Sequence, residues 1–294
     1  MDPSIQKNNL VEVLEIPNLN NPILILSFDG WIDAAEVSKM TRQHLLETGV
    51  EGGQKIARFN TDRLLDHRSR RPKLQVIDGI ASKLTWPTIE LVHLQGIRET
   101  DICLLQGPEP DYEWKDFSKA VLSLCVTLGV SMTVGLGAYP AAVPHTRPTR
   151  LSCTASSREI IQHLEVVTPS IEIPAGIQAV IEAEVLAKNI PSIGLWAQVP
   201  HYLSSGTYPP AVLALLNGLT QITEIELKTN SLKEHSKTTK QRINGLVNRN
   251  SKYEAMVKKL EQAYDNLHDQ QIKLPTGEDL AAELEAFLRT QDEL

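Results

Sequence analysis

Residues 22–49 read PILILSFDGWIDAAEVSKMTRQHLLETG, and this stretch decides the fold. Its opening, residues 23–28, is almost continuously apolar, which is typical of a β-strand covered on both faces. Asp33 and Glu36 stand at capping-box spacing and predict a helix that ends at the closing glycine. Residues 55–59 predict a second strand, so the region is a β-α-β unit.

The chain beyond this unit keeps alternating between predicted strands and helices. Residues 74–77 and 81–84 flank Asp78-Gly79 and predict a β-hairpin. Further strands are predicted at residues 89–94, 101–106, 131–136, 151–154 and 192–199, and helices at 112–128, 158–164, 176–188 and 209–227. This alternation predicts an α/β domain over residues 1–229, with a mainly parallel sheet between helices.

Residues 230–294 are predicted to form a helical appendage. Spacings of three and four predict a helix with a heptad-like stripe: Ile243, Leu246, Asn250, Tyr253, Val257, Leu260, Tyr264 and Leu267. A second short helix is predicted to carry Leu280, Leu284, Phe287 and Leu288. One interpretation is a helical hairpin packed on itself or on the main domain. The other is a coiled-coil contact between subunits, with Asn250 fixing the register.

The composition narrows the function classes. The 294 residues carry a formal charge of −7, so we expect no nucleic-acid partner, because such binders present a basic face. No apolar run approaches the ~20 residues that span a bilayer, and no secretory leader is evident, so we expect a cytoplasmic protein without a membrane contact. The scattered Cys103, Cys125 and Cys153 predict buried core thiols rather than a metal site.

Nine residues of interest are predicted at or just beyond strand ends, where α/β sheets bind ligands. They are Asp29, Trp31 and Asp33 after the first strand, Gly137 and Tyr139 in a predicted strand-end loop over residues 135–140, His145 and Arg147 beyond it, and His201 and Tyr202 after the last strand. No GxSxG, HExxH, GxGxxG or Walker-type motif accompanies them. We therefore predict no catalytic set, metal or cofactor, and treat these nine residues as a candidate ligand pocket or interaction surface.

The order of four segments resembles the proteasome assembly chaperone 2 family, in its longer bacterial branch. They are FDGWIDAA at residues 28–35, GLGAYP at 135–140, HTRP at 145–148 and VPHYL at 199–203. The resemblance covers about residues 22–227. It implies a three-layer α/β/α fold that is phosphorylase/hydrolase-like, and a group of proteasome-assembly chaperones without an established enzymatic activity. Some archaeal members dock through a C-terminal hydrophobic-Tyr-X tail, whereas this sequence ends in QDEL.

Two functional hypotheses remain. The first is a non-catalytic protein-interaction or assembly factor that works as a homo-oligomer, with proteasome subunits among its candidate partners. The alternative is a protein or enzyme that binds a nucleoside or a phosphorylated compound. In that case Asp29, Asp33, Arg147 and His201 would have to converge on one pocket.

Overall fold

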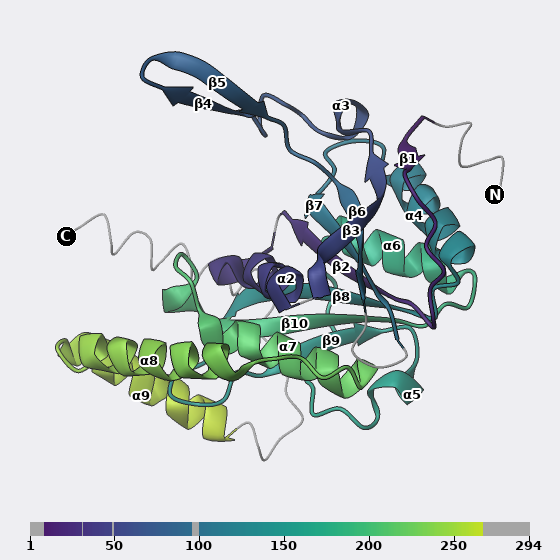
Figure 1. The fold of residues 1–294 in the computed structure, drawn as a ribbon. Coiled ribbons are helices and arrows are strands. Elements are labelled where there is room, and N and C mark those ends of the chain that lie inside the picture. Colours follow the sequence, from purple (N-terminus) through teal and green to yellow (C-terminus); the bar gives the residue numbers. More distant parts are fainter. Residues whose placement is uncertain (1–8, 31, 49, 96–99, 267–294) are drawn as a thin grey trace.

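An eight-stranded mixed sheet between two layers of helices forms the centre of the molecule (Figure 1). The computed structural model describes residues 9–266, except 31, 49 and 96–99. The sheet order is β1-β3-β6-β7-β2-β8-β10-β9. The strands are β1 (Val11–Val13), β2 (Ile23–Asp29), β3 (Val50–Phe59), β6 (Glu90–Gln95), β7 (Ile102–Pro108), β8 (Met132–Ala141), β9 (Leu151–Ala155) and β10 (Ser192–Pro200).

Four adjacent strands of the sheet are parallel, and the strands on either side of them are antiparallel. β7, β2, β8 and β10 run in the same direction. β1, β3 and β6 continue the sheet antiparallel on one side, and β9 closes it antiparallel on the other. The predicted three-layer α/β fold is confirmed, with a parallel centre in place of a mainly parallel sheet.

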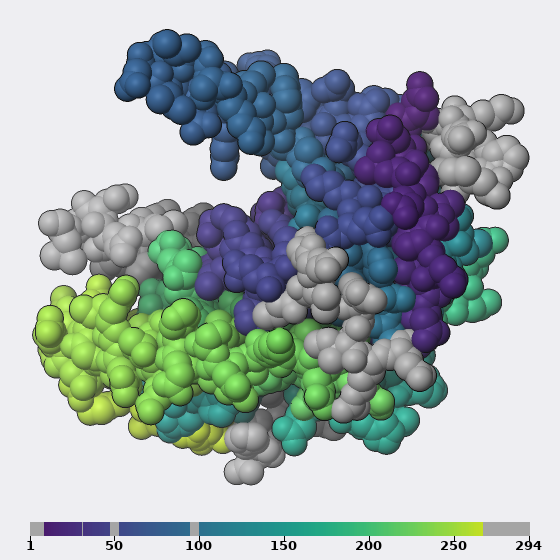
Figure 2. All heavy atoms as spheres, viewed as in Figure 1, coloured from purple at the N-terminus to yellow at the C-terminus, as the bar shows by residue number. Residues whose placement is uncertain are grey.

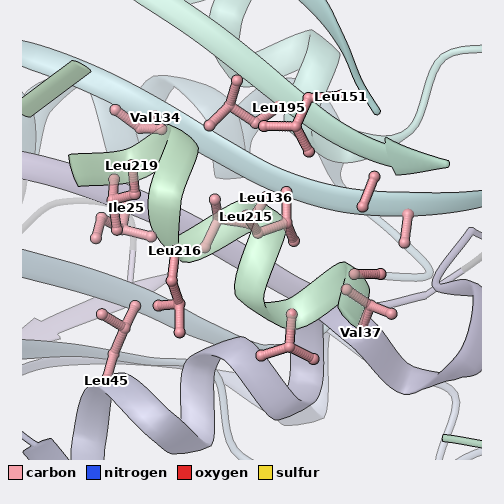
Figure 3. Close-up of a cluster of buried hydrophobic side chains, with 14 of the residues drawn as sticks. Ile25, Val37, Leu45, Val134, Leu136, Leu151, Leu195, Leu215, Leu216 and Leu219 are labelled. Atoms are coloured by element: carbon pink, nitrogen blue, oxygen red, sulfur yellow. The ribbon is translucent and has the colours of Figure 1, made fainter. Parts of the chain in front are cut away.

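Each face of the sheet has its own apolar core. One core joins the sheet to α2 (Val37–Thr48) and α7 (Pro209–Thr223), and Figure 3 shows the leucines of α7 inserted between strand and helix side chains. The other core lies under α4 (Trp114–Leu128) and α6 (Ile177–Leu186). The three cysteines are buried and unpaired, as predicted. Short helices are α3 (Thr61–Leu64), α5 (Arg158–Ile161), and the 3-10 turns η1 (Ala34–Glu36) and η2 (His201–Leu203).

The predicted hairpin is confirmed as β4 (Lys73–Ile77) and β5 (Ile80–Thr85). Its turn residues Asp78 and Gly79 both have positive φ, 50° and 80°, which is the backbone of a type I′ turn. The two strands form a separate sheet that projects from the body (Figure 1). We call this hairpin the arm.

The long heptad helix predicted for residues 243–267 is wrong. Within the described residues, the appendage forms α8 (Asn230–Val247) and α9 (Ser251–Asn266), which lie side by side (Figure 1). Asn250 lies in the turn between them, where its Oδ1 accepts a hydrogen bond from the backbone N–H of Lys252 at 3.0 Å. It therefore caps α9 and sets no coiled-coil register. Leu267 and the second predicted helix lie outside the described residues.

The appendage shares the core of the main domain. Leu232 and Ile243 of α8 are 7% and 8% exposed and belong to the same apolar cluster as α7 and the sheet. The interpretation in which the helices pack on the main domain is the one that the structure bears out for α8.

Candidate functional site

Two loops leave neighbouring parallel strands at the same edge of the sheet. β8 and β10 pair from Thr133↔Ser192 to Ala141↔Pro200, so both chains emerge together. The chain after β8 carries His145 and Arg147, and η2 directly after β10 carries His201 and Tyr202. The rings of His201 and Tyr202 make an edge contact with centroids 5.4 Å apart. Four of the nine predicted site residues therefore gather here.

His145 is fully buried at the centre of this group. Its backbone N–H donates to the Tyr202 hydroxyl oxygen at 3.0 Å, and its Nδ1 lies 2.6 Å from the same oxygen. Its Nε2 lies 2.9 Å from Oδ1 of Asn244 on α8. Because an amide oxygen only accepts, Nε2 carries the proton and Nδ1 accepts from the tyrosine hydroxyl. The ring is thus held as one neutral tautomer.

The electrostatic environment favours that neutral form. Burial lowers the pKa of His145, and the nearby Lys240 ammonium lowers it further. The hydrogen bond to Asn244 and the charge of Glu261 act in the opposite direction without cancelling the effect of burial. A histidine that is neutral and bonded at both ring nitrogens is positioned to hold two chain segments together.

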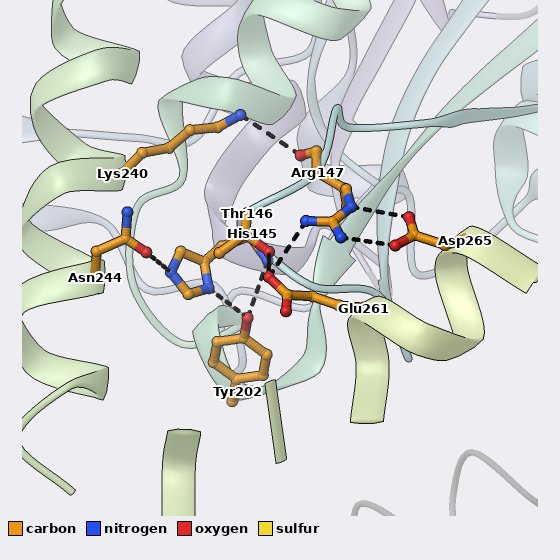
Figure 4. A network of polar contacts seen from close by, with 8 residues as sticks. All are labelled: His145, Thr146, Arg147, Tyr202, Lys240, Asn244, Glu261 and Asp265. Atoms are coloured by element: carbon orange, nitrogen blue, oxygen red, sulfur yellow. Dashed lines mark hydrogen bonds and ion pairs between the residues drawn. The ribbon is translucent and has the colours of Figure 1, made fainter. Parts of the chain in front are cut away.

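Arg147 is tied to α9. Its Nε and Nη2 donate to the two carboxylate oxygens of Asp265 at 2.8 and 2.7 Å, and its Nη1 donates to Glu261 at 3.3 Å (Figure 4). Hydrogen bonding to Asp265 raises the pKa of Arg147. The hydroxyl of Thr146 also donates to Glu261, and Nζ of Lys240 reaches the carbonyl oxygen of Arg147 at 3.5 Å. The two parallel hydrogen bonds from Arg147 to Asp265 form the bidentate geometry in which a guanidinium binds a carboxylate most strongly.

We call this network the appendage joint. It consists of His145, Thr146, Arg147 and Tyr202 from the main domain, with Lys240 and Asn244 from α8 and Glu261 and Asp265 from α9 (Figure 4). Arg150 adds a cation–π contact between the main domain and α9, because its guanidinium carbon lies 3.6 Å from the ring centroid of Tyr264.

The α8 and α9 partners of the joint were not singled out from the sequence. Lys240 and Asn244 are four residues apart, as are Glu261 and Asp265, so each pair lies on one helix face. That spacing can be read from the sequence. The sequence does not show that both helix faces contact the loop after β8.

The first-strand candidates have structural partners of their own. Oδ1 of Asp29 accepts from Nη2 of Arg42 at 2.8 Å, and Arg42 also donates to the carbonyl of Ser27. Asp33 accepts from the backbone N–H groups of Ser38 at 2.7 Å and Lys39 at 3.2 Å. Burial raises the pKa of Asp33, and the charge of Asp29 adds to that rise. Trp31 lies outside the described residues.

The capping box predicted from Asp33 and Glu36 is wrong, although Asp33 does cap the helix. Residues 34–36 form a 3-10 turn in which Ala35 and Glu36 have left-handed backbone, with φ of 57° and 53°. This interrupts the helix, so α2 begins only at Val37. Asp33 therefore reaches two N–H groups further along the chain, and the Glu36 carboxylate pairs with Lys39 instead.

The strand-end loop predicted at residues 135–140 is also wrong, because those residues are part of β8. A Cβ on Gly137 would lie 2.3 Å from ring carbons of Trp196, so this glycine lets the indole lie across the strand. Two residues on, the Tyr139 hydroxyl bonds Ser152 of β9 at 2.7 Å, and Gln198 donates to the same Ser152 oxygen at 3.0 Å. Gly137 and Tyr139 thus serve packing between strands on the sheet face opposite α7.

Two carboxyl groups that were not among the nine predicted site residues, those of Glu182 and Glu109, make hydrogen bonds at α6. Burial raises the pKa of Glu182 on α6 to about 7, while hydrogen bonds from Gln178 and Thr154 act to lower it. Oε1 of Glu109 accepts the first free backbone N–H of α6, at Ile177, at 2.7 Å. Both carboxyl groups hold α6 against the sheet.

Neither a metal cluster nor a membrane span is found in the described part of the chain. No group of three or more His, Cys, Asp or Glu side chains there is arranged to hold a metal ion. None of the helices within residues 9–266 is long and apolar enough to cross a bilayer.

Comparison with known structures finds close likenesses in two actinobacteria. A protein of unknown function from Corynebacterium glutamicum ATCC 13032 is 28% identical, with a TM-score of 0.84 over 89% of this chain and 99% of that one. A Mycobacterium tuberculosis protein of unknown function is 30% identical, with a TM-score of 0.82 over 89% of this chain and 90% of that one. A second M. tuberculosis protein, described as a proteasome-assembly chaperone homologue, is 27% identical, with a TM-score of 0.73 over 80% of this chain and 99% of that one.

No protein with a curated description matches the chain significantly. The model of the PAC2 family matches residues 27–247, which include β8, β10, the polar loop between them and all of α8. The resemblance read from the four sequence segments is therefore confirmed, and this chain belongs to the PAC2 family.

Proposed function

We propose that this chain is a non-catalytic protein-interaction factor that acts in the manner of an assembly chaperone. The observation that carries the proposal is the appendage joint, in which the polar groups at the strand ends hold a pair of helices against the sheet. Arg147 binds Asp265 and Glu261, and His145 is buried and bonded at both ring nitrogens. Because these side chains are bonded to one another, their role is to position the surface formed by α8 and α9 rather than to react with a substrate.

The small-molecule hypothesis requires four residues to converge with free polar groups. Instead, Asp29 is paired with Arg42, Asp33 caps α2, and Arg147 is bound to α9. A guanidinium already bound to two carboxylates would have to release them before it could hold a phosphate in a bidentate way. These contacts favour an interaction role over ligand chemistry.

The proposed partner class is the proteasome or its subunits, and the proposed state is a cytoplasmic homo-oligomer. Support comes from the M. tuberculosis relative described as a proteasome-assembly chaperone homologue, which aligns over 99% of its own length. More distant structures described as an archaeal proteasome activator and an archaeal homologue of proteasome-assembly chaperone share the fold.

The test is direct binding to purified proteasome core particles and to isolated α-subunits, followed by sedimentation and by native mass spectrometry. We expect comigration with one of them and no retained nucleotide or nucleoside mass. The Arg147→Glu variant, which places a third carboxylate in the joint, should weaken comigration. Lys258→Glu on α9 is the matched control, because Lys258 pairs with Glu254 one turn away on the exposed surface. A retained nucleoside together with no comigration would overturn the proposal.

A further inference from the structure

The turn between α8 and α9 lies at the outer edge of the molecule (Figure 2). Leu246 and Tyr253 stand on either side of this turn and are 55% and 42% exposed. Farther from the turn, Ile243 of α8 and Val257 of α9 are only 8% and 5% exposed. The turn thus leaves two large apolar side chains in solvent, although both helices bury such residues farther along.

Three basic residues flank these apolar side chains. Arg242, Leu246 and Arg249 are spaced by four and three, and the backbone N–H of Arg249 donates to the carbonyl of Leu246 at 3.2 Å, so the three share one helix face. Lys252 precedes Tyr253 in the first turn of α9. The basic residues are exposed, and none of their side chains makes an ion pair or a hydrogen bond to another described residue. We call Arg242, Leu246, Arg249, Lys252 and Tyr253 the tip.

Helix stability does not account for all of this charge. Arg249, just past the end of α8, is favourable there, because a cation complements the negative end of the helix dipole. Lys252 is the second residue of α9, where the positive end of the dipole opposes a cation. The exposed Lys258, in contrast, is paired with Glu254. Uncovered apolar residues with a polar rim are typical of a surface that binds a protein.

The charge of the tip indicates the chemistry of its partner. Residues 235–253 hold five Lys and Arg and no Asp or Glu, a net charge of +5. The whole chain carries −7, so the remaining residues carry −12. A nucleic acid or an anionic membrane presents negative charge over a larger area than the tip and would also face those residues. An acidic area of limited size on a protein complements the tip alone.

We propose that the tip docks on an acidic surface of a partner protein. Its two apolar residues are the anchors of the contact, and its three basic residues pair with carboxylates around them. The appendage joint holds the tip in place, because it bonds α8 and α9 to the loop after β8. Two copies of this chain each carry −7 and repel one another at long range, which disfavours a second copy as the occupant. The inference rests on the proposed function and names the surface that meets the partner.

The first experiment measures binding of full-chain variants to purified core particles and to isolated α-subunits by surface plasmon resonance. Arg249→Glu/Lys252→Glu reverses the charge of the tip. Lys115→Glu/Lys119→Glu makes the same change in net charge at exposed positions of α4, on the other face of the sheet. We expect the first pair to raise the dissociation constant about tenfold or more, mainly through slower association, and the second pair to leave it within about twofold. Equal effects of the two pairs would overturn the inference.

Leu246→Ser tests an apolar anchor separately, because it leaves every charge in place. We expect dissociation from the core particle or α-subunit to be faster by about tenfold, while the association rate stays within about twofold of the wild type. Leu186→Ser on α6 is the matched control, since Leu186 is 47% exposed. Because both leucines are about half exposed, both variants should keep the thermal unfolding midpoint of the wild type. An unchanged dissociation rate for Leu246→Ser would contradict the proposed contact.

Crosslinking identifies what covers the tip. The native cysteines are buried, so Asn248→Cys in the turn can be labelled selectively with benzophenone maleimide, and it keeps both apolar anchors. On irradiation with core particles, we expect a crosslink to a proteasome subunit at a peptide rich in Asp and Glu. Residues 267–294 hold seven Asp and Glu against two Lys and Arg, so they are a competing occupant. A crosslink only to these residues, or only to a second copy, would overturn the inference.

Two further probes test the other polyanions. The wild type is mixed with vesicles of phosphatidylserine and phosphatidylcholine for sedimentation, and with a DNA duplex for a gel shift. We expect it to bind neither. Binding to either probe that Arg249→Glu/Lys252→Glu abolishes would assign the tip to that polyanion and overturn the inference.

Core-particle binding by the wild type separates the inference from the proposed function. If the wild type binds and the tip variants behave like their controls, the inference fails while the proposed function stands. If the wild type binds neither core particles nor α-subunits, the proposed partner class fails and the inference fails with it. Binding that is weakened by the tip variants and kept by their controls supports both.

Discussion

Gly137 lacks a side chain because Trp196 occupies the space where a Cβ would stand. Gly135, two residues earlier on the same face of the strand, leaves space for the side chain of Gln178, whose amide nitrogen would lie 1.9 Å from an added Cβ. From the sequence these glycines predict a loop, since glycine weakens strands. The strand forms nonetheless because its other face, with Val134 and Leu136, is buried in the core.

Gly137→Ala is therefore expected to destabilise the protein by about 1–3 kcal/mol, because the indole must move to admit a methyl group. The urea unfolding midpoint measures the change. Gly206→Ala is the matched control, since an added Cβ there meets nothing within 4 Å. Equal midpoints for the two variants would contradict the packing described for Trp196.

His145 makes the appendage joint sensitive to pH. Its pKa in the folded protein lies below the unfolded value of about 6.5, mainly because of burial. The folded state thus binds fewer protons than the unfolded state between those two values. The contribution of this neutral histidine is fully present above about pH 6.5 and is lost as the pH falls through the folded pKa.

Acidification from pH 7.5 to 5.5 should therefore loosen α8 and α9 before the rest of the chain. Hydrogen exchange of amides in 230–266 should speed up relative to those of β2 and β8. Asn244, Lys240, Glu261 and Tyr202 face the ring. His145→Gln keeps a polar side chain without a titrating ring, so its exchange should change less over this pH range. An unchanged pH response in that variant would show that His145 does not cause the effect.

At the scale of helices and strands, the sequence predicts an element correctly where the spacing of its apolar residues and the residues at its ends indicate the same structure. The arm was predicted to the residue at its Asp78-Gly79 turn, and β2 from its almost continuous apolar run. The long appendage helix failed because a three-and-four spacing of apolar residues continues across a helix–turn–helix junction. The helix is broken at residues 248–250, but the spacing of the apolar residues continues across them and so gives no sign of the break.

The capping role of Asn250 gives a prediction for α9. Asn250→Ala removes the acceptor for the Lys252 N–H and should destabilise the start of α9 by about 1 kcal/mol. Amide exchange in the first turn of α9 should rise several-fold, while exchange in α7 stays unchanged. Asn248→Ala, on the other side of the turn, is the control, because Asn248 bonds α8 through its backbone N–H, which the substitution keeps. Similar effects of the two changes would argue against the cap.

At the scale of the whole molecule, the candidate site could be predicted only in part. The sequence placed His145, Arg147, His201 and Tyr202 after strands, and parallel pairing of β8 with β10 brings those strand ends together. The contacts with α8 and α9 join residues far apart in the chain, for example 99 positions for His145 and Asn244, and no local pattern encodes them. Predicting the joint therefore required the fold.

The sequence composition predicts a boundary at residue 229 between the α/β domain and the helical appendage, and truncation of the chain tests that boundary. If α8 were a detachable appendage, a chain ending at residue 229 would keep the stability of the full protein. Instead Leu232 and Ile243 lie in the same core cluster as α7 and the sheet. Burial of each contributes about 1.5–3 kcal/mol, so their loss should cost about 3–6 kcal/mol and leave α7 exposed.

A chain ending at Val247 provides the comparison, because it keeps both residues and lacks only the segment from residue 248 onward, which includes α9. We expect its thermal unfolding midpoint to lie between those of the full chain and of the chain ending at residue 229, since it loses the buried Val257 and Tyr264 of α9 together with the ion pairs of Arg147, which are partly exposed and weak. The chain ending at residue 229 should unfold well below both and should aggregate at lower concentration. Equal midpoints for the two truncations would show that α8 adds little to the core, and would support a domain boundary at residue 229. A large drop for the longer chain would instead make α9 and the appendage joint the main stabilising contact.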